Sequence, residues 1–187
     1  EFRRVLFRSG VIAADGTFGK SRNGDYTPRI DLYGDKKEFM GEIKESVHRV
    51  IDNNIDALSE IHHSSNVTPD FCDSDSADRT SLSSALLGRI LASHGFTKET
   101  KLEVPEFVWR GDSSTRWAYL DGIFRLDGGF VGSVKSGHMS AQLGSISQEF
   151  LREIQTLLID LGVTSSIYTG RKEEQVTFLP DGQGGIK

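Results

Sequence analysis

Two short stretches of the sequence place an aspartate and a glycine at the same distance behind an earlier glycine. Residues 10–16 read Gly-Val-Ile-Ala-Ala-Asp-Gly, and residues 122–128 read Gly-Ile-Phe-Arg-Leu-Asp-Gly. An internal repeat of this kind predicts that the fold is built from two related structural units, one for each copy. Asp15 and Asp127 are therefore candidates for equivalent roles in two related halves.

The chemistry expected of these aspartates depends on where helices end. The C-terminal end of a helix carries partial negative charge and disfavours a carboxylate by up to about 1 kcal/mol. Two carboxylates brought together at two such ends also repel each other. Hard divalent cations relieve both effects, since carboxylate and carbonyl oxygens are their preferred ligands. About two or three such ions between Asp15 and Asp127 would activate a water molecule and stabilise a leaving oxygen on phosphate.

Small residues indicate how the two stretches come together. Gly10 and Gly122 carry no side chain, so we expect each to open a seam through which one helix packs closely against the other. We also expect Gly16 and Gly128 to stop the helices by adopting the left-handed conformation that glycine tolerates. An Asp-Gly pair after a helix is a common turn, and either copy alone fits that simpler interpretation. Two copies followed by the same order of elements favour a shared site.

The elements after the first copy begin with a strand at Thr17, a turn over residues 22–25 and an alternating strand over 29–33. Apolar residues three or four apart then predict a helix over 39–51. A Ser- and Asp-rich stretch over 57–80 has weak strand signals. The last element of this half is a predicted helix whose apolar face begins at Leu82 and which ends at Gly95.

The elements after the second copy follow a similar order. Strands are predicted over 130–134 and 139–143. Ser147 is expected to cap a helix that Gly162 ends, because serine accepts a hydrogen bond from the first turn. Two further short strands are expected over 165–169 and 175–179. Each half therefore reads helix, two strands, helix, two strands, which is an α+β organisation.

Polar side chains on or beside these strands have the types that contact phosphates and base edges in a DNA groove. Alternation with apolar residues places them on one face of each strand, although any one of them also fits a solvated strand surface. The candidates are Lys20, Arg22, Arg29, Lys135, His138, Ser140, Gln142, Tyr168, Arg171 and Lys172.

Composition limits the alternatives. The chain is 36% hydrophobic and 26% charged, as in ordinary globular proteins, and has no apolar run long enough to span a bilayer. A single cysteine, Cys72, excludes an internal disulfide and favours the reducing cytoplasm. The net charge of −5 is unusual for a protein that binds DNA, although a basic groove can lie on an acidic body.

At these residues the sequence resembles the LAGLIDADG homing endonucleases, most closely the endonuclease domains found within inteins. The nine-residue motif corresponds to residues 8–16 and 120–128, and the resemblance extends through 104–111 and 150–168. Ala13 stands where the first motif has its earlier aspartate, and Arg125 and Leu126 depart from the second motif.

The resemblance implies a site-specific endonuclease that cuts double-stranded DNA with Mg²⁺. It implies a monomer of two αββαββ(α) halves, with the motif helices packed at the centre and the sheets forming a saddle on DNA. Asp15 and Asp127 match the metal-binding aspartates, and Lys101 is the nearest match to the lysine that assists ahead of the second motif. Intein splicing segments and a host extein would flank the domain in a longer protein.

The expected metal ligands are limited to these two aspartates. A glycine at position 14 would be a further candidate beside Asp15, but the residue at that position is Ala14. We therefore expect no metal ligand from position 14.

We expect the following division of the chain. Residues 1–9 read like a non-native leader, 10–103 form the first half, 104–111 the linker and 112–187 a C-terminally truncated second half. Pro105 supports the linker, because proline breaks helices and restrains the residue before it.

Two other functions remain open. The acidic charge, Arg125 and the offset of Lys101 from the family pattern also fit a DNA-binding module that has lost its nuclease activity. His62, His63 and Cys72 with neighbouring aspartates raise the alternative of a zinc-organised interaction domain. No pair of thiols at zinc-finger spacing supports that alternative.

Overall fold

The computed structural model describes residues 2–20, 26–59, 69–74, 78–133, 135 and 137–169. The first half begins with the motif helix α1 (Phe2–Asp15), which continues directly into strand β1 (Gly16–Lys20). The remaining elements of this half are β2 (Tyr26–Tyr33), the 3₁₀ helix η1 (Gly34–Phe39), α2 (Met40–Ser59), β3 (Asp70–Ser74), β4 (Arg79–Ser83) and α3 (Ala85–Ser93).

The four strands of the first half form one antiparallel sheet in the order β1-β2-β4-β3. Alternation along β2 gives this sheet two different faces. Ile30 and Leu32 are buried against the helices, whereas Arg29 and Asp31 lie on the opposite face. The predicted strand over 29–33 is confirmed as part of β2.

A short connection precedes the second motif. Residues 104–111 contain one turn of helix, α4 (Glu106–Trp109), with Pro105 at its N-cap. The backbone N–H of Val104 donates to Glu153 Oε2 at 2.6 Å, which ties the connection to the last helix among the described residues.

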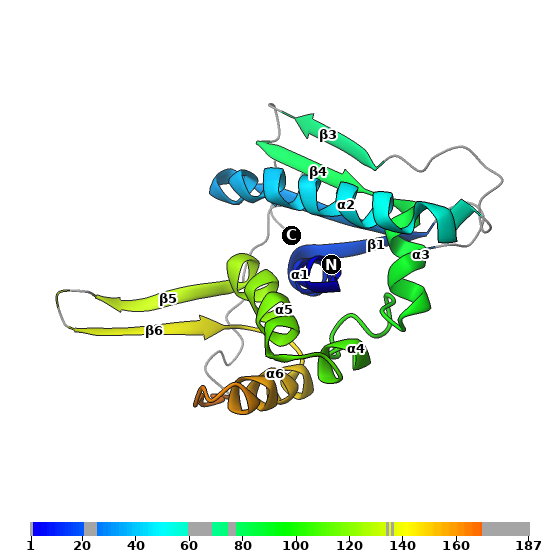
Figure 1. Ribbon diagram of the computed structural model, residues 1–187. Helices are drawn as coiled ribbons and strands as arrows, with labels where there is room; N and C mark the ends of the chain where they lie inside the picture. The colour runs from blue at the N-terminus through cyan, green and yellow to red at the C-terminus, as the bar shows by residue number, and fades with distance from the viewer. Residues whose placement is uncertain are drawn as a thin grey trace.

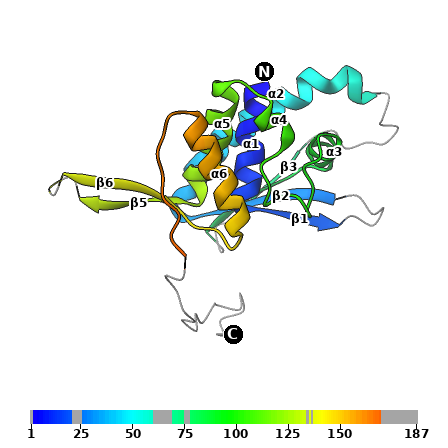
Figure 2. The same cartoon turned by 90° about the horizontal axis from the view of Figure 1, so that it is seen from below.

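The second half consists of the motif helix α5 (Ser113–Leu126), strands β5 (Gly128–Ser133) and β6 (His138–Leu143), and α6 (Gln148–Asp160). The two strands form an antiparallel hairpin that extends away from the body (Figures 1 and 2). Almost every residue of the hairpin is exposed, including Phe130 at 79% and Met139 at 56%. Within the described residues, β5 and β6 pair only with each other.

The strand predicted over 165–169 is wrong, because residues 163–169 have neither helix nor strand structure. The segment instead runs beside α6, where Gln155 Nε2 donates to the carbonyl of Ser165 at 2.9 Å. A strand also needs a neighbouring strand to pair with, and no described strand pairs with this segment. The strand predicted over 175–179 and the turn over 22–25 lie outside the described residues.

The helix boundaries follow from capping. Ser147 Oγ accepts from the N–H of Phe150 at 3.1 Å, and Gly162 ends α6 with φ of +80°, so both predicted ends of this helix are confirmed. The helix predicted to begin near Leu82 begins at Ala85 instead. Ser84 caps it, and Leu82 belongs to β4, where it pairs with Ile30.

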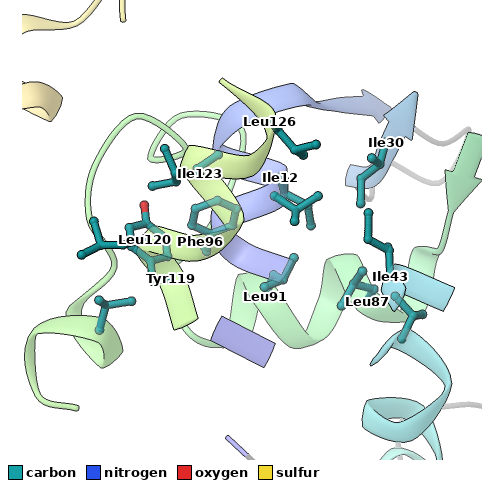
Figure 3. Packing of buried hydrophobic residues seen from close by; sticks show 14 of the residues in the cluster. Ile12, Ile30, Ile43, Leu87, Leu91, Phe96, Tyr119, Leu120, Ile123 and Leu126 are labelled. Carbon is teal, nitrogen blue, oxygen red and sulfur yellow. The ribbon is translucent and has the colours of Figure 1, made fainter. Parts of the chain in front are cut away.

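The two motif helices lie side by side at the centre of the molecule, with the four-stranded sheet on one side and the hairpin on the other (Figures 1 and 2). Figure 3 shows side chains from both halves converging in one cluster, with Ile12 near its middle. Fully buried members include Ile12, Ile30, Ile43, Leu91 and Tyr119. The predicted α+β fold, with two motif-helix halves packed at the centre, is confirmed, and the described residues include no helix long and apolar enough to cross a membrane.

Candidate active site at the paired helix ends

The close approach of the motif helices rests on two glycines. A Cβ atom added at Gly10 would lie 2.2 Å from the backbone oxygen of Tyr119 and 3.2 Å from the Cα of Gly122. Real Cβ atoms do not come so close to backbone, so α1 and α5 touch at a point where neither has a side chain. The C-terminal ends of the two helices are therefore held together.

Each motif ends in an aspartate followed by a glycine that starts a strand. Asp15 is the last residue of α1, and Asp127 is the C-cap of α5, with its N–H bonded to the carbonyl of Ile123 at 2.9 Å. Neither Gly16 nor Gly128 has the positive φ expected from the sequence, so that explanation is wrong. A Cβ would instead lie 2.5 Å from the carbonyl oxygen of Ile12 at Gly16, and 2.3 Å from that of Phe124 at Gly128.

Position 14, directly before the first aspartate, holds an alanine and not a glycine. Ala14 is half-buried and packs against the hydrophobic core, within the last turn of α1. The methyl side chain of Ala14 offers no oxygen to a cation. The glycine that does contribute a backbone oxygen beside Asp15 is Gly16, whose carbonyl accepts from Lys101.

The two aspartates interact directly. Partial burial raises the pKa of Asp127, and the negative charge of Asp15 and a hydrogen bond between the two carboxyl groups raise this pKa further. The positive charges of Lys36 and Lys101 oppose this shift. Two like charges are thus crowded at two helix ends that already disfavour them.

Two lysines lie at this cluster. Lys36 Nζ forms an ion pair with Asp15 Oδ2 at 2.8 Å, and both side chains are partly exposed. Lys101 Nζ donates to the backbone carbonyl of Gly16 at 2.5 Å. Partial burial lowers the pKa of Lys101, while the charges of Asp127 and Asp15 act against that shift. Lys101 was predicted as a candidate; Lys36 was missed, because its place beside Asp15 depends on how the chain turns after β2.

An open hollow of about 430 Å³ adjoins the cluster on the first half. It is lined by Asp15, Thr17, Asp31, Tyr33, Asp35 and Lys36. Most of these residues belong to β1, β2 or η1, so the hollow runs from the helix ends onto the outer face of the sheet. The hollow thus joins the outer face of the sheet to Asp15.

The donors at the helix ends fit a divalent cation only in part. Asp15 and Asp127 supply two carboxylates, and the carbonyl of Gly16 lies beside them. Among the described residues no group of three or more His, Cys, Asp or Glu could hold a metal ion. Mg²⁺ commonly binds through one or two carboxylates and fills its remaining positions with water and phosphate oxygens, so the donor set fits a cation that is shared with a phosphate substrate.

Arg125 departs from the motif pattern, and its side chain contacts residues other than Asp15 and Asp127. Its Nη1 donates to Glu42 on α2 at 2.8 Å, and its Nε donates to Asp121 at 2.9 Å. The guanidinium also lies 5.8 Å from the ring centroid of Phe39. The contacts with Asp121 and Glu42 raise the pKa of Arg125, mainly through the hydrogen bond to Asp121. The contacts with Glu42 and Phe39 also join the two halves of the molecule.

The predicted DNA contacts fall into three places. Lys20 ends β1, and Arg29 lies on the outer face of β2, where its Nε is 2.9 Å from Asp31. Lys135, His138, Ser140 and Gln142 lie at the tip or on the second strand of the exposed hairpin, and Tyr168 follows α6 with 68% of its surface exposed. Arg22, Arg171 and Lys172 lie outside the described residues.

Sequence reasoning missed a second arginine on the outer face of the sheet. Arg79 on β4 has its Nε 3.8 Å from Asp31, so one carboxylate lies between Arg29 and Arg79. The register of β2 and β4 brings these residues together, and no local pattern indicates it. Cys72 is exposed on β3, and His62 and His63 lie outside the described residues.

Comparison with known proteins agrees with this geometry. Residues 114–179 match the LAGLIDADG-like domain family. The chain is 35% identical over 186 residues to the ribonucleoside-diphosphate reductase NrdEB subunit alpha of Bacillus subtilis (strain 168), covering 98% of the chain and 16% of the reductase. It is 25% identical over 162 residues to a DNA polymerase of Thermococcus litoralis, covering 85% of the chain and 8% of the polymerase. The chain thus spans a small part of the curated relatives it matches.

Solved structures share the fold. Mesophilic variants of the homing endonuclease I-DmoI align with a TM-score of 0.57 and 14% identity, covering 98% of this chain and 85% of that chain. I-DmoI in complex with DNA and Mn aligns with a TM-score of 0.58 and 15% identity, covering 90% and 83%.

The chain contains two repeats, and the central helix of each repeat ends at an aspartate. The two aspartates lie next to each other, which defines a class of two-motif α+β proteins. The resemblance stated from the sequence is confirmed to this extent: residues 114–179 match the LAGLIDADG-like domain family, and the chain shares the fold of the homing endonuclease I-DmoI.

Proposed function

We propose that this chain is the homing endonuclease domain of an intein, which cuts both strands of a specific double-stranded DNA site with the help of divalent cations. The observation that carries the proposal is the meeting of Asp15 and Asp127 at the paired ends of α1 and α5. Two carboxylates with mutually unfavourable charge are an arrangement that a bound cation stabilises.

Each residue of the cluster has a defined task in this proposal. Asp15 and Asp127 would hold the cations, with Mg²⁺ as the physiological ion and two or three ions in the site. The bound ions would supply an activated water and charge stabilisation at the scissile phosphates. Lys101, held at the carbonyl of Gly16, places a positive charge where a phosphate oxygen gains negative charge during cleavage.

The sheet and the hairpin would provide the DNA saddle. The outer face of the four-stranded sheet carries Arg29 and Arg79 and is continuous with the hollow at Asp15. On the second half, His138 and Gln142 lie on the exposed strand β6. The hairpin of β5 and β6 extends outward from the end of α5 (Figure 1). I-DmoI, which shares this fold, has been solved in complex with DNA and Mn.

The intein context is supported by where related segments occur. Nearly the whole chain aligns with a small part of a reductase, and most of it aligns with a still smaller part of a DNA polymerase. A reductase and a polymerase have no activity in common that would require this segment. An inserted element that carries its own activity accounts for its presence in both, and we propose a reductase as the host of this chain.

The proposed protein acts as a monomer inside the cell, with halves at residues 10–103 and 112–187 joined by 104–111. Both halves would be needed on one chain, because each supplies one aspartate to the common site. Residues 2–9 of the predicted leader belong to α1, and the origin of the leader stays a prediction.

The decisive experiment measures cleavage of a supercoiled plasmid that carries an uninterrupted reductase coding sequence, with Mg²⁺ as the cation. We expect wild type to produce linear DNA, and Asp15→Asn and Asp127→Asn each to reduce cleavage about a hundredfold or more, because a metal ligand is lost. Asp121→Asn is the matched control, since this aspartate lies on the same helix but pairs with Arg125. It should cut nearly as well as wild type.

A second candidate function is a DNA-binding module without nuclease activity. Lys36 and Lys101 favour it, because the carboxylate of Asp15 and the carbonyl oxygen of Gly16 at the end of the first motif each already contact an ammonium group. In that case wild type and Asp127→Asn would bind the plasmid equally in a gel-shift assay, and neither would cut it. That outcome would exclude the nuclease and leave the DNA-binding module.

A further inference from the structure

The positive charges around the two motif ends are unequal. At the first end, Lys36 Nζ lies 2.8 Å from Asp15 Oδ2, and Lys101 Nζ lies 2.5 Å from the carbonyl oxygen of Gly16. A carboxylate oxygen of Asp15, the last residue of α1, and the carbonyl oxygen of Gly16, the first residue of β1, thus each contact an ammonium group.

The second end is different. Among the described residues no ion pair involves Asp127, and its carboxyl group lies within hydrogen-bonding reach of Asp15. The positive charges of Lys36 and Lys101 still act on Asp127, and that of Lys101 acts on Asp127 more strongly than on Asp15. The segment that follows the hairpin, residues 144–147, corresponds in element order to η1 in the first half. It begins at Gly144, reads Gly-Ser-Ile-Ser and contains no cationic residue, whereas η1 supplies Lys36.

Lys36 occupies a place that suits a cation. Its ammonium group contacts one carboxylate of the pair, and its positive charge opposes the rise in the pKa of Asp127. A divalent ion bound at the same carboxylate oxygen would lie next to Lys36, and two cations in contact repel each other. Lys36 and a divalent ion therefore cannot both keep their best positions at Asp15.

Lys36 is also able to leave. Its side chain is 40% exposed and belongs to the short η1 helix at the edge of the hollow, and its partner Asp15 is 28% exposed. Partly exposed ion pairs are weak, since water compensates for their loss. A lysine held in this way acts as a replaceable counter-ion rather than as a fixed part of the core.

We propose that Lys36 is a built-in cation that neutralises Asp15 in the metal-free protein and competes with divalent metal for it. This inference rests on the metal site of the proposed function, but it concerns metal binding and not DNA cleavage.

The test measures Ca²⁺ binding to the whole chain by isothermal titration calorimetry without DNA. Lys36→Met removes the competing charge and keeps the length of the side chain, so we expect Ca²⁺ to bind about fivefold tighter or more. Lys37→Met is the matched control, because the neighbouring lysine pairs with Asp78 on the far side of η1. Its Ca²⁺ affinity should equal that of wild type.

A double-variant cycle assigns the effect to Asp15. In an Asp15→Asn background, Lys36→Met should give no gain in Ca²⁺ affinity, because there is no carboxylate left to compete for. A second readout is the melting temperature of the metal-free protein, which should be lower for Lys36→Met and should rise more steeply with added Ca²⁺. Lys36→Gln replaces Lys36→Met should the latter not fold.

Unchanged or weaker Ca²⁺ binding by Lys36→Met, or no Ca²⁺ binding by any form, overturns the inference. Tighter binding by a protein that does not cut DNA supports the inference and excludes the nuclease. The two proposals thus fail separately.

Discussion

At the scale of single residues, the site is an unfavourable arrangement that the fold imposes. Gly10 and Gly122 bring the helix ends together, so Asp127 cannot move away from Asp15 without separating α1 from α5. The pKa of Asp127 is raised as a result. Strain of this kind at a cluster of charges is typical of a functional site, because a stable fold would otherwise avoid it.

The raised pKa of Asp127 gives a prediction for stability. The folded protein keeps the Asp127 proton to a higher pH than the unfolded chain does, so metal-free protein loses stability as pH rises from about 3.9 through the folded pKa. Asp127→Asn removes this loss. After allowance for solvent screening, we expect it to be about 0.5 kcal/mol more stable than wild type at pH 7, or about 1–2 °C in melting temperature.

Differential scanning calorimetry in EDTA at pH 7 and pH 3.5 checks this prediction. The advantage of Asp127→Asn should disappear at pH 3.5, where the wild-type carboxyl is protonated in both states. Asp121→Asn serves as the control, since it loses an ion pair with Arg125 and should gain no stability at either pH. An advantage that persists at pH 3.5 would point to packing rather than to charge.

The residues of the site differ in how far sequence could predict them. Asp15 and Asp127 follow from a repeat, which is visible without any structure. Lys36 and Arg79 do not, because each acquires its partner through a turn or a strand register that brings distant residues together. Gly16 was expected for its backbone freedom, and the structure gives a different reason, the nearness of the carbonyl of Ile12.

At the scale of elements, the contact between α1 and α5 decides whether the two halves assemble. Gly10→Ala adds one methyl group 2.2 Å from the backbone oxygen of Tyr119, and backbone cannot move aside as a flexible side chain can. We expect a loss of about 1–3 kcal/mol in the free energy of unfolding, together with loss of DNA cleavage. Urea denaturation followed by circular dichroism measures the change.

Gly41→Ala is the matched control for that substitution. Gly41 lies in α2, and a Cβ there would meet no atom within 4 Å. Alanine favours helix by about 1 kcal/mol over glycine, so this variant should be as stable as wild type or more stable. Equal effects of the two substitutions would contradict a special role for Gly10.

Element positions could largely be predicted from the sequence where a cap or an alternation marks them. Ser147 and Gly162 correctly predicted the two ends of α6, and the alternation of polar and apolar residues correctly predicted part of β2. The error at Leu82 has a simple cause, since one apolar residue fits the end of a buried strand as well as the start of a helix. The strand expected over 165–169 depended on a partner that periodicity alone cannot supply.

At the scale of the whole molecule, the distribution of charge matters more than its total. The net charge is −5, and on the outer face of the sheet Asp31 forms a close ion pair with Arg29 at 2.9 Å and a looser one with Arg79 at 3.8 Å. A DNA-binding surface in this state is partly neutralised by its own carboxylate. Binding to phosphates would require Arg29 and Arg79 to exchange one partner for another.

Asp31→Asn tests this balance. Releasing two arginines for phosphate contacts should tighten DNA binding several-fold at low salt and steepen the slope of log K against log salt by about 1–2. Fluorescence anisotropy over a series of salt concentrations measures both. Asp160→Asn on α6 makes the same change in net charge away from the sheet, so an equal effect there would attribute the gain to total charge alone.

The α+β class and the central pair of helices could be predicted because the repeat sets them. The unequal sizes of the two described sheets could not, because strand count depends on pairings that no short pattern encodes.

The hairpin of β5 and β6 has a practical consequence for handling the protein. Its two strands extend from the body with Phe130, Val131 and Met139 exposed, and within the described residues each strand has one edge without a partner. Open apolar edges of this kind recruit strands from neighbouring molecules. Self-association through this hairpin would then limit the solubility of the chain in storage, and a lysine in place of Val131 is the simplest way to keep it dispersed.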